Sequence, residues 1–231
     1  MRTLAGKRHA FHTWGFPTFR CRMTTREALQ SRLERGIAAL GLALPDDAVG
    51  RLLDYRELLE RWNTAYNLTA VRDADEMVTR HLLDSLAVVP FVQGRTLADL
   101  GTGPGLPGIP LAIAEPAREV LMVDSNGKKV RFLREAIRSL KLGNGRALQS
   151  RVEDVEGSFE CITARAFASL ADMLGWGGHL LAPGGVWLAM KGKHPGDELA
   201  GVPAGFTVEA IHALSVPDVE GERHLVVIRR G

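Results

Sequence analysis

The sequence of 231 residues predicts an α/β fold: a mainly parallel sheet that ends in an antiparallel hairpin and is preceded by helices. Three observations support this prediction. From residue 96 onward, short apolar runs alternate with helical patterns, which is typical of a parallel, doubly wound sheet. A turn with three glycines follows the first of these runs. The last two runs are joined by a loop too short for a crossover helix, so they should pair antiparallel.

The first predicted elements are helices. Thr24-x-x-Glu27 and Asp73-x-x-Glu76 have the spacing of capping boxes, and Gly41 is typical of a residue that ends a helix. Leucines recur at helical spacing in the second helix, so one of its faces should pack on the sheet. The predicted helices span residues 24–40, 46–63 and 73–89.

Strands and helices then alternate. Strands are assigned where β-branched and other apolar residues cluster between turn residues, and helices where the apolar period is longer. The predicted strands are 96–100, 119–123, 146–149, 159–165, 186–191, 207–214 and 224–230, and the predicted helices are 108–114, 127–141 and 169–181.

Composition sets limits on the class of protein. No apolar run reaches the ~20 residues of a membrane span, and Cys21 and Cys161 are too few and too far apart for a disulfide framework or a CxxC metal site. We expect a monomeric protein of the reducing cytoplasm that binds no metal. Residues 1–22 carry five basic and no acidic side chains, so we expect a disordered tail, or a chain whose translation begins at Met23.

The glycine turn predicts a nucleotide-type site. Gly101, Gly103 and Gly105 lack a Cβ at alternate positions, so the main chain can take positive φ and approach a ligand closely. About 20 residues later, the strand 119–123 leads to Asp124, whose carboxylate can accept hydrogen bonds from ribose hydroxyls. The two features have the spacing of a βαβ unit. Asp124 also suits the role of a helix cap, and both roles can coexist.

Two ligands compete for this turn. The segment 103–108 satisfies G-x-G-x-x-G, so it could hold the pyrophosphate of NAD in an oxidoreductase. Against this, Pro104 and Pro107 remove two backbone N–H donors. Asp99 lies at the strand end, where it can face the cationic amino-acid moiety of S-adenosylmethionine but would repel a phosphate. The string D-x-G-x-G-x-G followed by an acid after the next strand resembles motif I of class I methyltransferases.

Other side chains near the predicted strand ends complete the candidate site. Leu106 can lie against the methionine chain, while Val152 and Glu153 follow the third strand and can hold the adenine. Arg165 ends a strand that is otherwise apolar, where an unpaired charge would cost several kcal/mol. It therefore needs an anionic partner, which is either cofactor or RNA, or a structural acid such as Asp99.

Basic residues near the site mouth suggest nucleic acid. A basic stripe can bind phosphates, although such a stripe on a helix is also typical of a solvated face. The candidates for RNA contact are Lys128, Lys129, Arg131, Arg151 and Lys191.

The sequence indicates no general base. An amino-group methylase would carry an N/D-P-P-Y/F loop and a cytosine-carbon methylase a nucleophilic cysteine in a loop, and neither is present. A ring nitrogen such as guanine N7 has a lone pair available, so its methylation needs positioning more than proton removal. His81 and His224 are interpreted as structural histidines. The catalytic residue stays unknown.

Six segments together resemble the RsmG (GidB) family of bacterial 16S rRNA guanine-N7 methyltransferases, from about residue 24 to the C-terminus. The Pro-Gly-Leu-Pro-Gly continuation of the glycine loop and Arg165-Ala-Phe-Ala-Ser-Leu170 are the most specific. The segments are 99–110, 124–133, 67–71, 81–86, 165–170 and 222–228.

The resemblance implies a class I (Rossmann-like) S-adenosylmethionine-dependent methyltransferase fold, with an N-terminal helical region over 23–92 and a methyltransferase domain over 93–231. It also implies S-adenosylmethionine as the donor, a guanine in the 530 loop of 16S rRNA as the acceptor, and the small ribosomal subunit or its rRNA as the partner. The implied cofactor residues are Gly101, Leu106, Val152, Glu153 and Arg165. The alternatives are the oxidoreductase and an RNA-binding protein of this fold that lacks turnover.

Overall fold

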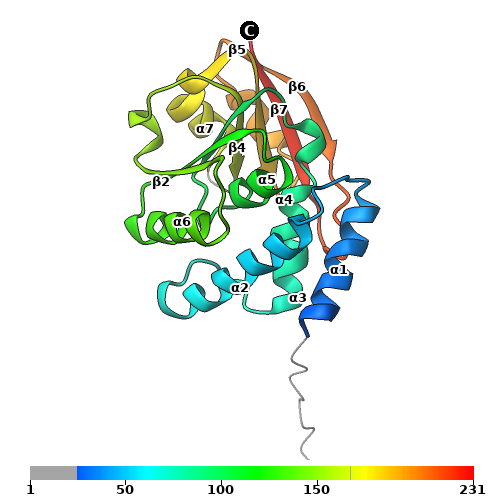
Figure 1. Cartoon of the computed structure of the whole chain (residues 1–231). Coiled ribbons are helices and arrows are strands. Elements are labelled where there is room, and N and C mark those ends of the chain that lie inside the picture. Colours follow the sequence, from blue (N-terminus) through cyan, green and yellow to red (C-terminus); the bar gives the residue numbers. More distant parts are fainter. Residues whose placement is uncertain (1–24, 167) are drawn as a thin grey trace, which may run out of the picture.

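One sheet organises the part of the chain that the structure, a computed structural model, describes: residues 25–166 and 168–231. In these residues seven strands pair in the order β3-β2-β1-β4-β5-β7-β6 (Figure 1). The first five are parallel, and β7 runs antiparallel to both β5 and β6. The predicted parallel sheet with a C-terminal antiparallel hairpin is confirmed. The strands are β1 (Thr96–Leu100), β2 (Glu119–Asp124), β3 (Gly145–Gln149), β4 (Phe159–Arg165), β5 (Leu181–Lys191), β6 (Phe206–Ala213) and β7 (His224–Arg230).

The predicted tail and the predicted cap at Thr24 lie outside the described residues. Within them, helix α1 (Arg26–Ala39) begins two residues later than expected, because Thr25 is its N-cap and the Thr25 hydroxyl accepts a hydrogen bond from the Ala28 N–H. Helix α2 (Ala48–Tyr66) follows. The Asp73 cap is confirmed, since its carboxylate accepts the Glu76 N–H at 2.9 Å at the start of α3 (Ala74–Met77).

The third N-terminal helix is not the uniform α-helix that was predicted. After α3 the chain forms a π-helix over Val78–Leu83, then α4 (Asp84–Leu86) and a 3₁₀ turn over Val89–Phe91. Almost every side chain from residue 77 to residue 88 is buried. A segment that is buried on nearly all sides has no solvent-facing stripe from which the number of residues per turn could be read, so the sequence could not reveal the wider turns.

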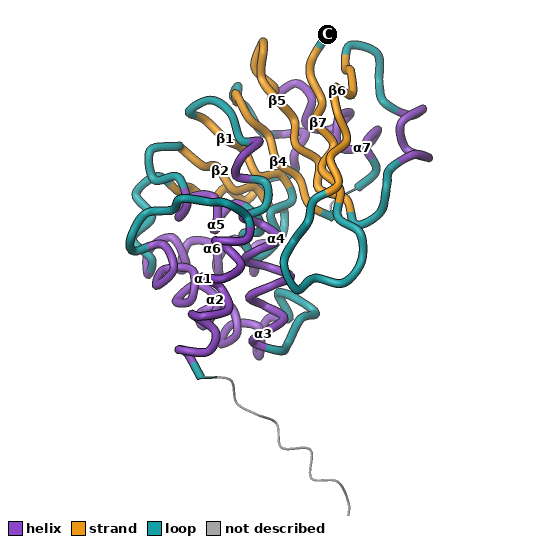
Figure 2. Tube along the Cα trace, turned by 90° about the vertical axis from the view of Figure 1, so that its right-hand side faces the viewer, coloured by secondary structure: helices purple, strands orange, loops and turns teal. Residues whose placement is uncertain are grey.

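The two faces of the sheet are covered unequally (Figure 2). Alternate residues of β5 point to opposite faces, as in any strand. Leu188 packs with α5 (Gly108–Ala114), α6 (Gly127–Ser139) and the N-terminal helices, whereas Trp187 packs with α7 (Leu170–Gly177) on the other face. The N-terminal helices therefore share one continuous core with the sheet.

Strand β5 begins five residues earlier than predicted, and α7 is correspondingly shorter. The predicted strand started at residue 186, after Pro183-Gly184-Gly185, but the observed strand includes these three residues. Gly184 takes a φ of +74°, and the register between β4 and β5 shifts between Phe159 and Cys161. Glycines at such a β-bulge let the strand bend without ending.

The N-terminal helices also reach the glycine turn. The buried Tyr55 of α2 donates a hydrogen bond from its hydroxyl to the Pro104 carbonyl at 2.9 Å. Burial raises the pKa of Tyr55, so the hydroxyl keeps its proton and stays a donor.

We expect Tyr55→Phe to lower the free energy of unfolding by about 1 kcal/mol, because the Pro104 carbonyl loses its buried donor. Tyr66→Phe is the matched control, since the hydroxyl of this stacked, half-buried residue makes no hydrogen bond within the described chain. Urea denaturation of both variants measures the difference. Equal stability of the two variants would contradict the role of the Tyr55 hydroxyl.

Candidate active site

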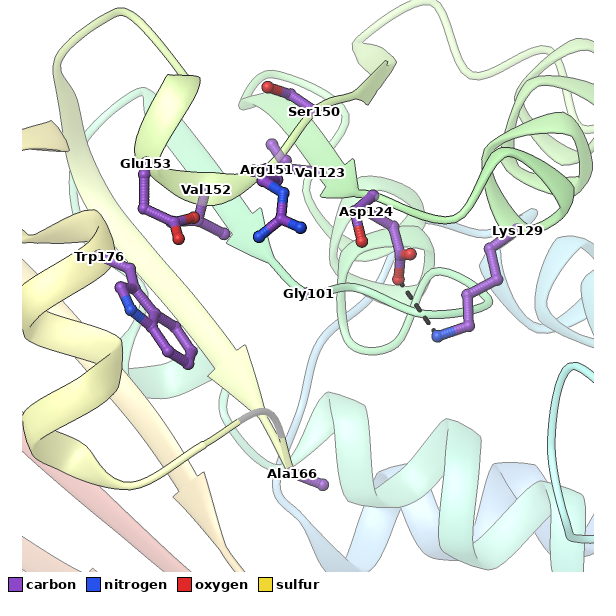
Figure 3. A pocket seen from close by; sticks show the side chains of 11 residues that line it. Gly101, Val123, Asp124, Lys129, Ser150, Arg151, Val152, Glu153, Ala166 and Trp176 are labelled. Atoms are coloured by element: carbon purple, nitrogen blue, oxygen red, sulfur yellow. Dashed lines mark hydrogen bonds and ion pairs between the residues drawn. The ribbon is translucent and has the colours of Figure 1, made fainter.

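A cavity of about 430 Å³ lies at the carboxyl ends of the parallel strands. Ligands of doubly wound folds bind at this edge, because the loops that follow neighbouring strands meet there. The strand ends supply Gly101 after β1, Asp124 from β2 and Ala166 after β4 (Figure 3). The further lining residues are Val123, Ser125, Lys129, Ser150, Arg151, Val152, Glu153 and Trp176.

The three glycines of the turn have different roles. Gly101 and Gly103 take φ values of +65° and +61°, and a Cβ on Gly103 would meet nothing within 4 Å. That open space lets a ligand approach the backbone closely. Gly105, with φ +99°, lines neither this cavity nor the second cavity that adjoins it. A Cβ on Gly105 would lie 2.4 Å from Ile109 Cγ1. It serves packing beneath the turn.

Asp99 is not available to a ligand, contrary to the sequence-based expectation. Its side chain is fully buried, and its carboxylate accepts the Gly108 N–H at 2.8 Å and the Thr163 hydroxyl at 3.1 Å, in addition to the Thr102 hydroxyl. Burial raises the pKa of Asp99 to about 6, and these hydrogen bonds oppose the increase. The carboxylate holds the turn in shape from beneath.

Asp124 faces the cavity and also fixes the turn. Its Oδ2 accepts the Gly103 N–H at 3.0 Å and pairs with Lys129 Nζ at 3.4 Å, while Oδ1 accepts the Asn126 N–H at 2.8 Å. A carboxylate has about four lone-pair directions, so further hydrogen bonds from ribose hydroxyls can be accepted. The cap role foreseen for Asp124 is wrong, because Asn126 is the N-cap of α6 and its side chain accepts the Lys128 N–H at 2.9 Å.

The opposite wall of the cavity combines apolar and polar groups (Figure 3). Glu153 and Trp176 lie on the side away from Asp124, and Arg151 points between them and Asp124. Val152 is 5% exposed and belongs to the core beneath the cavity. Trp176 could not be identified from the sequence, because a tryptophan on a short helix gives no signal of which cavity it will line.

A second cavity of about 490 Å³ adjoins the first. Gly101, Lys129 and Ala166 line both, so the two form one cleft that passes the glycine turn. Leu106 and Gly103 line only the second cavity. Its other lining residues are Val71, Arg80, His81, Asp84, Thr102, Pro104, Arg165, Met190, Lys191, Gly192, Leu214, Arg223 and His224.

Arg165 has a structural acid as its partner, but that acid is Asp84 and not Asp99. Arg165 Nη1 donates to Asp84 Oδ2 at 2.9 Å, and Arg223 Nε donates to Asp84 Oδ1 at 2.9 Å. Asp84 comes from α4 in the N-terminal region, so this contact joins the helices to the sheet. A signal was present in the sequence: an acid among the leucines of His81-Leu-Leu-Asp-Ser-Leu86 must be buried, and a buried acid needs cations.

The five basic candidates separate into three groups. Lys129 and Arg151 line the cleft, whereas Lys128 and Arg131 line a separate hollow at the start of α6. Lys191 differs from the expectation of a phosphate contact, because its side chain is 11% exposed and its ammonium donates to the Ala168 carbonyl and the Glu198 carboxylate, each at 2.7 Å.

His81 is held as a neutral ring, in agreement with the structural interpretation. Its Nε2 lies 2.8 Å from the Thr69 hydroxyl. Burial, together with the neighbouring Arg165, lowers the pKa of His81 to about 4. His224 contacts the ring of His194, with 5.2 Å between the ring centroids.

The family described as rRNA small subunit methyltransferase G (GidB) matches residues 49–226. The chain belongs to this family. Ribosomal RNA small subunit methyltransferase G of Xanthomonas euvesicatoria pv. vesicatoria (strain 85-10) is 58% identical over 205 residues, which cover 88% of this chain and 96% of that protein. The same-named protein of Stenotrophomonas maltophilia (strain K279a) is 57% identical over 204 residues, or 87% of this chain and 95% of its own length. The protein is thus a methyltransferase.

Solved structures show the same fold at low sequence identity. TrmN from Thermus thermophilus matches with a TM-score of 0.56 and 18% identity over 67% of this chain and 53% of its own. The CcbJ methyltransferase from Streptomyces caelestis matches with a TM-score of 0.53 and 15% identity over 64% of this chain and 94% of its own. These likenesses confirm the class I methyltransferase fold of this GidB family member.

The described residues show two further properties. No helix among them is both long and apolar enough to cross a membrane. They also contain no group of three or more His, Cys, Asp and Glu side chains arranged to hold a metal ion.

We expect stability to depend on His81 in mildly acidic solution. The unfolded chain takes up a proton near pH 6.5 and the folded protein only near pH 4, so protonation favours unfolding as the pH falls through this window. Relative to His81→Asn, the wild-type unfolding free energy should fall by about 1 kcal/mol or more between pH 7 and pH 5. Parallel pH profiles of the two proteins in chemical denaturation would contradict the neutral, buried ring.

Proposed function

We propose that this protein transfers a methyl group from S-adenosylmethionine to N7 of a guanine in the 530 loop of 16S rRNA, as a monomeric enzyme of the cytoplasm. The observation that carries the proposal is the cleft formed by the two cavities. A nucleoside-sized chamber with Asp124 at its edge opens, past Gly101, into a second chamber lined by arginines. The family match, which names rRNA of the small subunit, supports the substrate class.

The residues of the first cavity fit the donor. Asp124 offers acceptors to ribose hydroxyls, Val152 and Trp176 offer apolar surface to a purine, and Glu153 offers an acceptor to its amino group. Gly103 leaves open space where the turn meets the second cavity. When bound, S-adenosylmethionine supplies an electrophilic methyl group on a sulfonium.

The structure supports a reaction that needs no general base. His81 is held neutral, with its Nε2 bonded to Thr69, and Asp99 is buried beneath the turn. The N7 atom of guanine already carries a lone pair in the plane of the ring, so the protein has to orient the base and exclude water. We therefore assign positioning and desolvation to the residues of the cleft, and we assign proton transfer to none of them.

The alternative of an NAD-dependent oxidoreductase would require a pyrophosphate site at the glycine turn, and the structure argues against one. A pyrophosphate would need the N–H groups at the start of α5, but the Gly108 N–H already donates to the Asp99 carboxylate. A Cβ on Gly108 would lie 2.6 Å from Met122 Cγ and 2.8 Å from Asp99 Oδ2, so this glycine serves internal packing. The third glycine of the G-x-G-x-x-G pattern thus has a structural reason that involves no dinucleotide.

One experiment tests the proposed reaction. Small ribosomal subunits from cells that lack the protein are incubated with the purified enzyme and labelled S-adenosylmethionine, and the modified nucleotide is mapped. We expect a single labelled guanine in the 530 loop, methylated at N7. Label at another atom or in another loop would show that the proposed acceptor is wrong. Cofactor binding without any transfer would favour the RNA-binding protein that lacks turnover.

We also expect Gly103→Ala to weaken binding of S-adenosylhomocysteine at least tenfold, because the methyl group would enter the second cavity beside Gly101, where the amino-acid end of the cofactor would extend toward Arg165. Gly41→Ala is the matched control, since Gly41 has a φ of +68° against +61° for Gly103 and no atom lies within 4 Å of its Cβ position. Both variants should lose about 1–2 kcal/mol of stability from left-handed strain. Calorimetric titration that shows equal affinity for the two variants would contradict the close approach of the ligand.

A further inference from the structure

The second cavity contains more positive charge than its own carboxylate balances. Asp84 is shared by two guanidinium groups, those of Arg165 and Arg223, each at 2.9 Å. Three other cations line this cavity, and each has a carboxylate of its own among the described residues: Lys129 pairs with Asp124, Lys191 with Glu198 and Arg80 with Glu76. One positive charge in excess therefore lies at Asp84.

This excess charge is partly removed from water. The Asp84 side chain is 5% exposed, and the side chains of Arg165 and Arg223 are 21% and 23% exposed. Charges in such surroundings are stable when they are paired, and a guanidinium is well suited to an oxyanion. The cavity is therefore built for a ligand that brings a negative group.

Two oxyanions come into consideration: the carboxylate of the cofactor and a phosphate of the RNA. Arg165 is the last residue of β4 and precedes Ala166, which lines both cavities. Arg223 immediately precedes β7, and its neighbours Leu214 and His224 line only the second cavity. Arg165 thus lies toward the first cavity and Arg223 away from it.

The second cavity also has the size and the walls for a nucleotide. Its volume of about 490 Å³ is within the range of small-molecule sites, roughly 300–1,000 Å³. Leu106, Met190 and Leu214 supply apolar surface for a base. Enzymes that act on a base take it out of the stack into such a pocket, where the reacting atom meets the catalytic groups.

We propose that the second cavity holds the acceptor guanosine, that Arg223 contacts its phosphate, and that Asp84 is the positioning residue that fixes Arg223. The proposal rests on the proposed function, since it places the acceptor beside the chamber assigned to the donor. It gives the N-terminal helices a direct part in the acceptor site, because Asp84 belongs to α4.

The test separates donor affinity from acceptor affinity. The dissociation constant of S-adenosylhomocysteine is measured by calorimetry, and KM and kcat are measured with small subunits from cells that lack the protein. Arg223→Ala should raise the KM for subunits about tenfold or more, as expected for a lost charged hydrogen bond, and leave the dissociation constant within about twofold. Arg165→Ala should instead weaken the binding of S-adenosylhomocysteine.

Matched variants control for net charge and for folding. Arg230→Ala removes the same charge from an exposed position at the other end of β7 and should leave KM unchanged. Asp84→Asn should raise KM while kcat at saturating subunits stays within about threefold, and Asp84→Glu should restore part of the loss. Arg223→Lys keeps the charge and should retain an intermediate KM if Arg223→Ala fails to fold.

Small ligands identify the group that Arg223 contacts. In the wild type, 5′-GMP should inhibit methyl transfer more strongly than guanosine, and Arg223→Ala or Arg223→Lys should reduce that difference. The proposal is overturned if Arg223→Ala weakens S-adenosylhomocysteine as much as it raises KM, if it leaves KM unchanged, or if GMP and guanosine inhibit the wild type equally. A wild-type protein that binds no S-adenosylhomocysteine or methylates no subunits would instead refute the proposed function.

Discussion

The buried carboxylate of Asp99 is the constraint on which the site depends. Within the described part of the chain it forms no ion pair; instead it accepts hydrogen bonds from the Thr102 hydroxyl, the Gly108 N–H and the Thr163 hydroxyl. These donors belong to the glycine turn, the start of α5 and β4, so one group fixes three elements that meet at the strand ends. With the turn held from beneath, the Gly103 N–H is directed to Asp124 and the open side of the turn faces the cleft.

The N-terminal helices complete the site that the sheet begins. Tyr55 of α2 holds the Pro104 carbonyl of the turn, and Asp84 of α4 fixes Arg165 and Arg223. Both contacts are partly buried, and both join residues far apart in the chain. In the cleft, the first cavity, proposed for the donor, is formed by strand ends. The second cavity is formed jointly by the N-terminal helices and the C-terminal hairpin. A helical region of this kind is part of the active-site architecture as well as part of the core.

The sequence predicted the sheet, its order of elements and most of the strand ends, because alternation, glycine turns and strand-end acids are local signals. The same signals located Gly101, Asp124, Val152 and Glu153 at one cavity. What they could not supply was pairing at long range. Arg165 was expected to need an anionic partner, and Asp99 was the acid named; the true partner, Asp84, depends on how α4 packs against the sheet. The bulge in β5 was missed because glycine and proline equally well end a strand or bend it.

The central claim is that the glycine turn and the ends of β1 and β2 form the donor site. The most direct measurement is a crystal structure of the protein with S-adenosylhomocysteine. We expect electron density in the first cavity, with the ribose at Asp124, the purine between Val152 and Trp176, and the sulfur toward the second cavity at Gly101. Density at the start of α5 or outside the cleft, with the first cavity vacant, would contradict it.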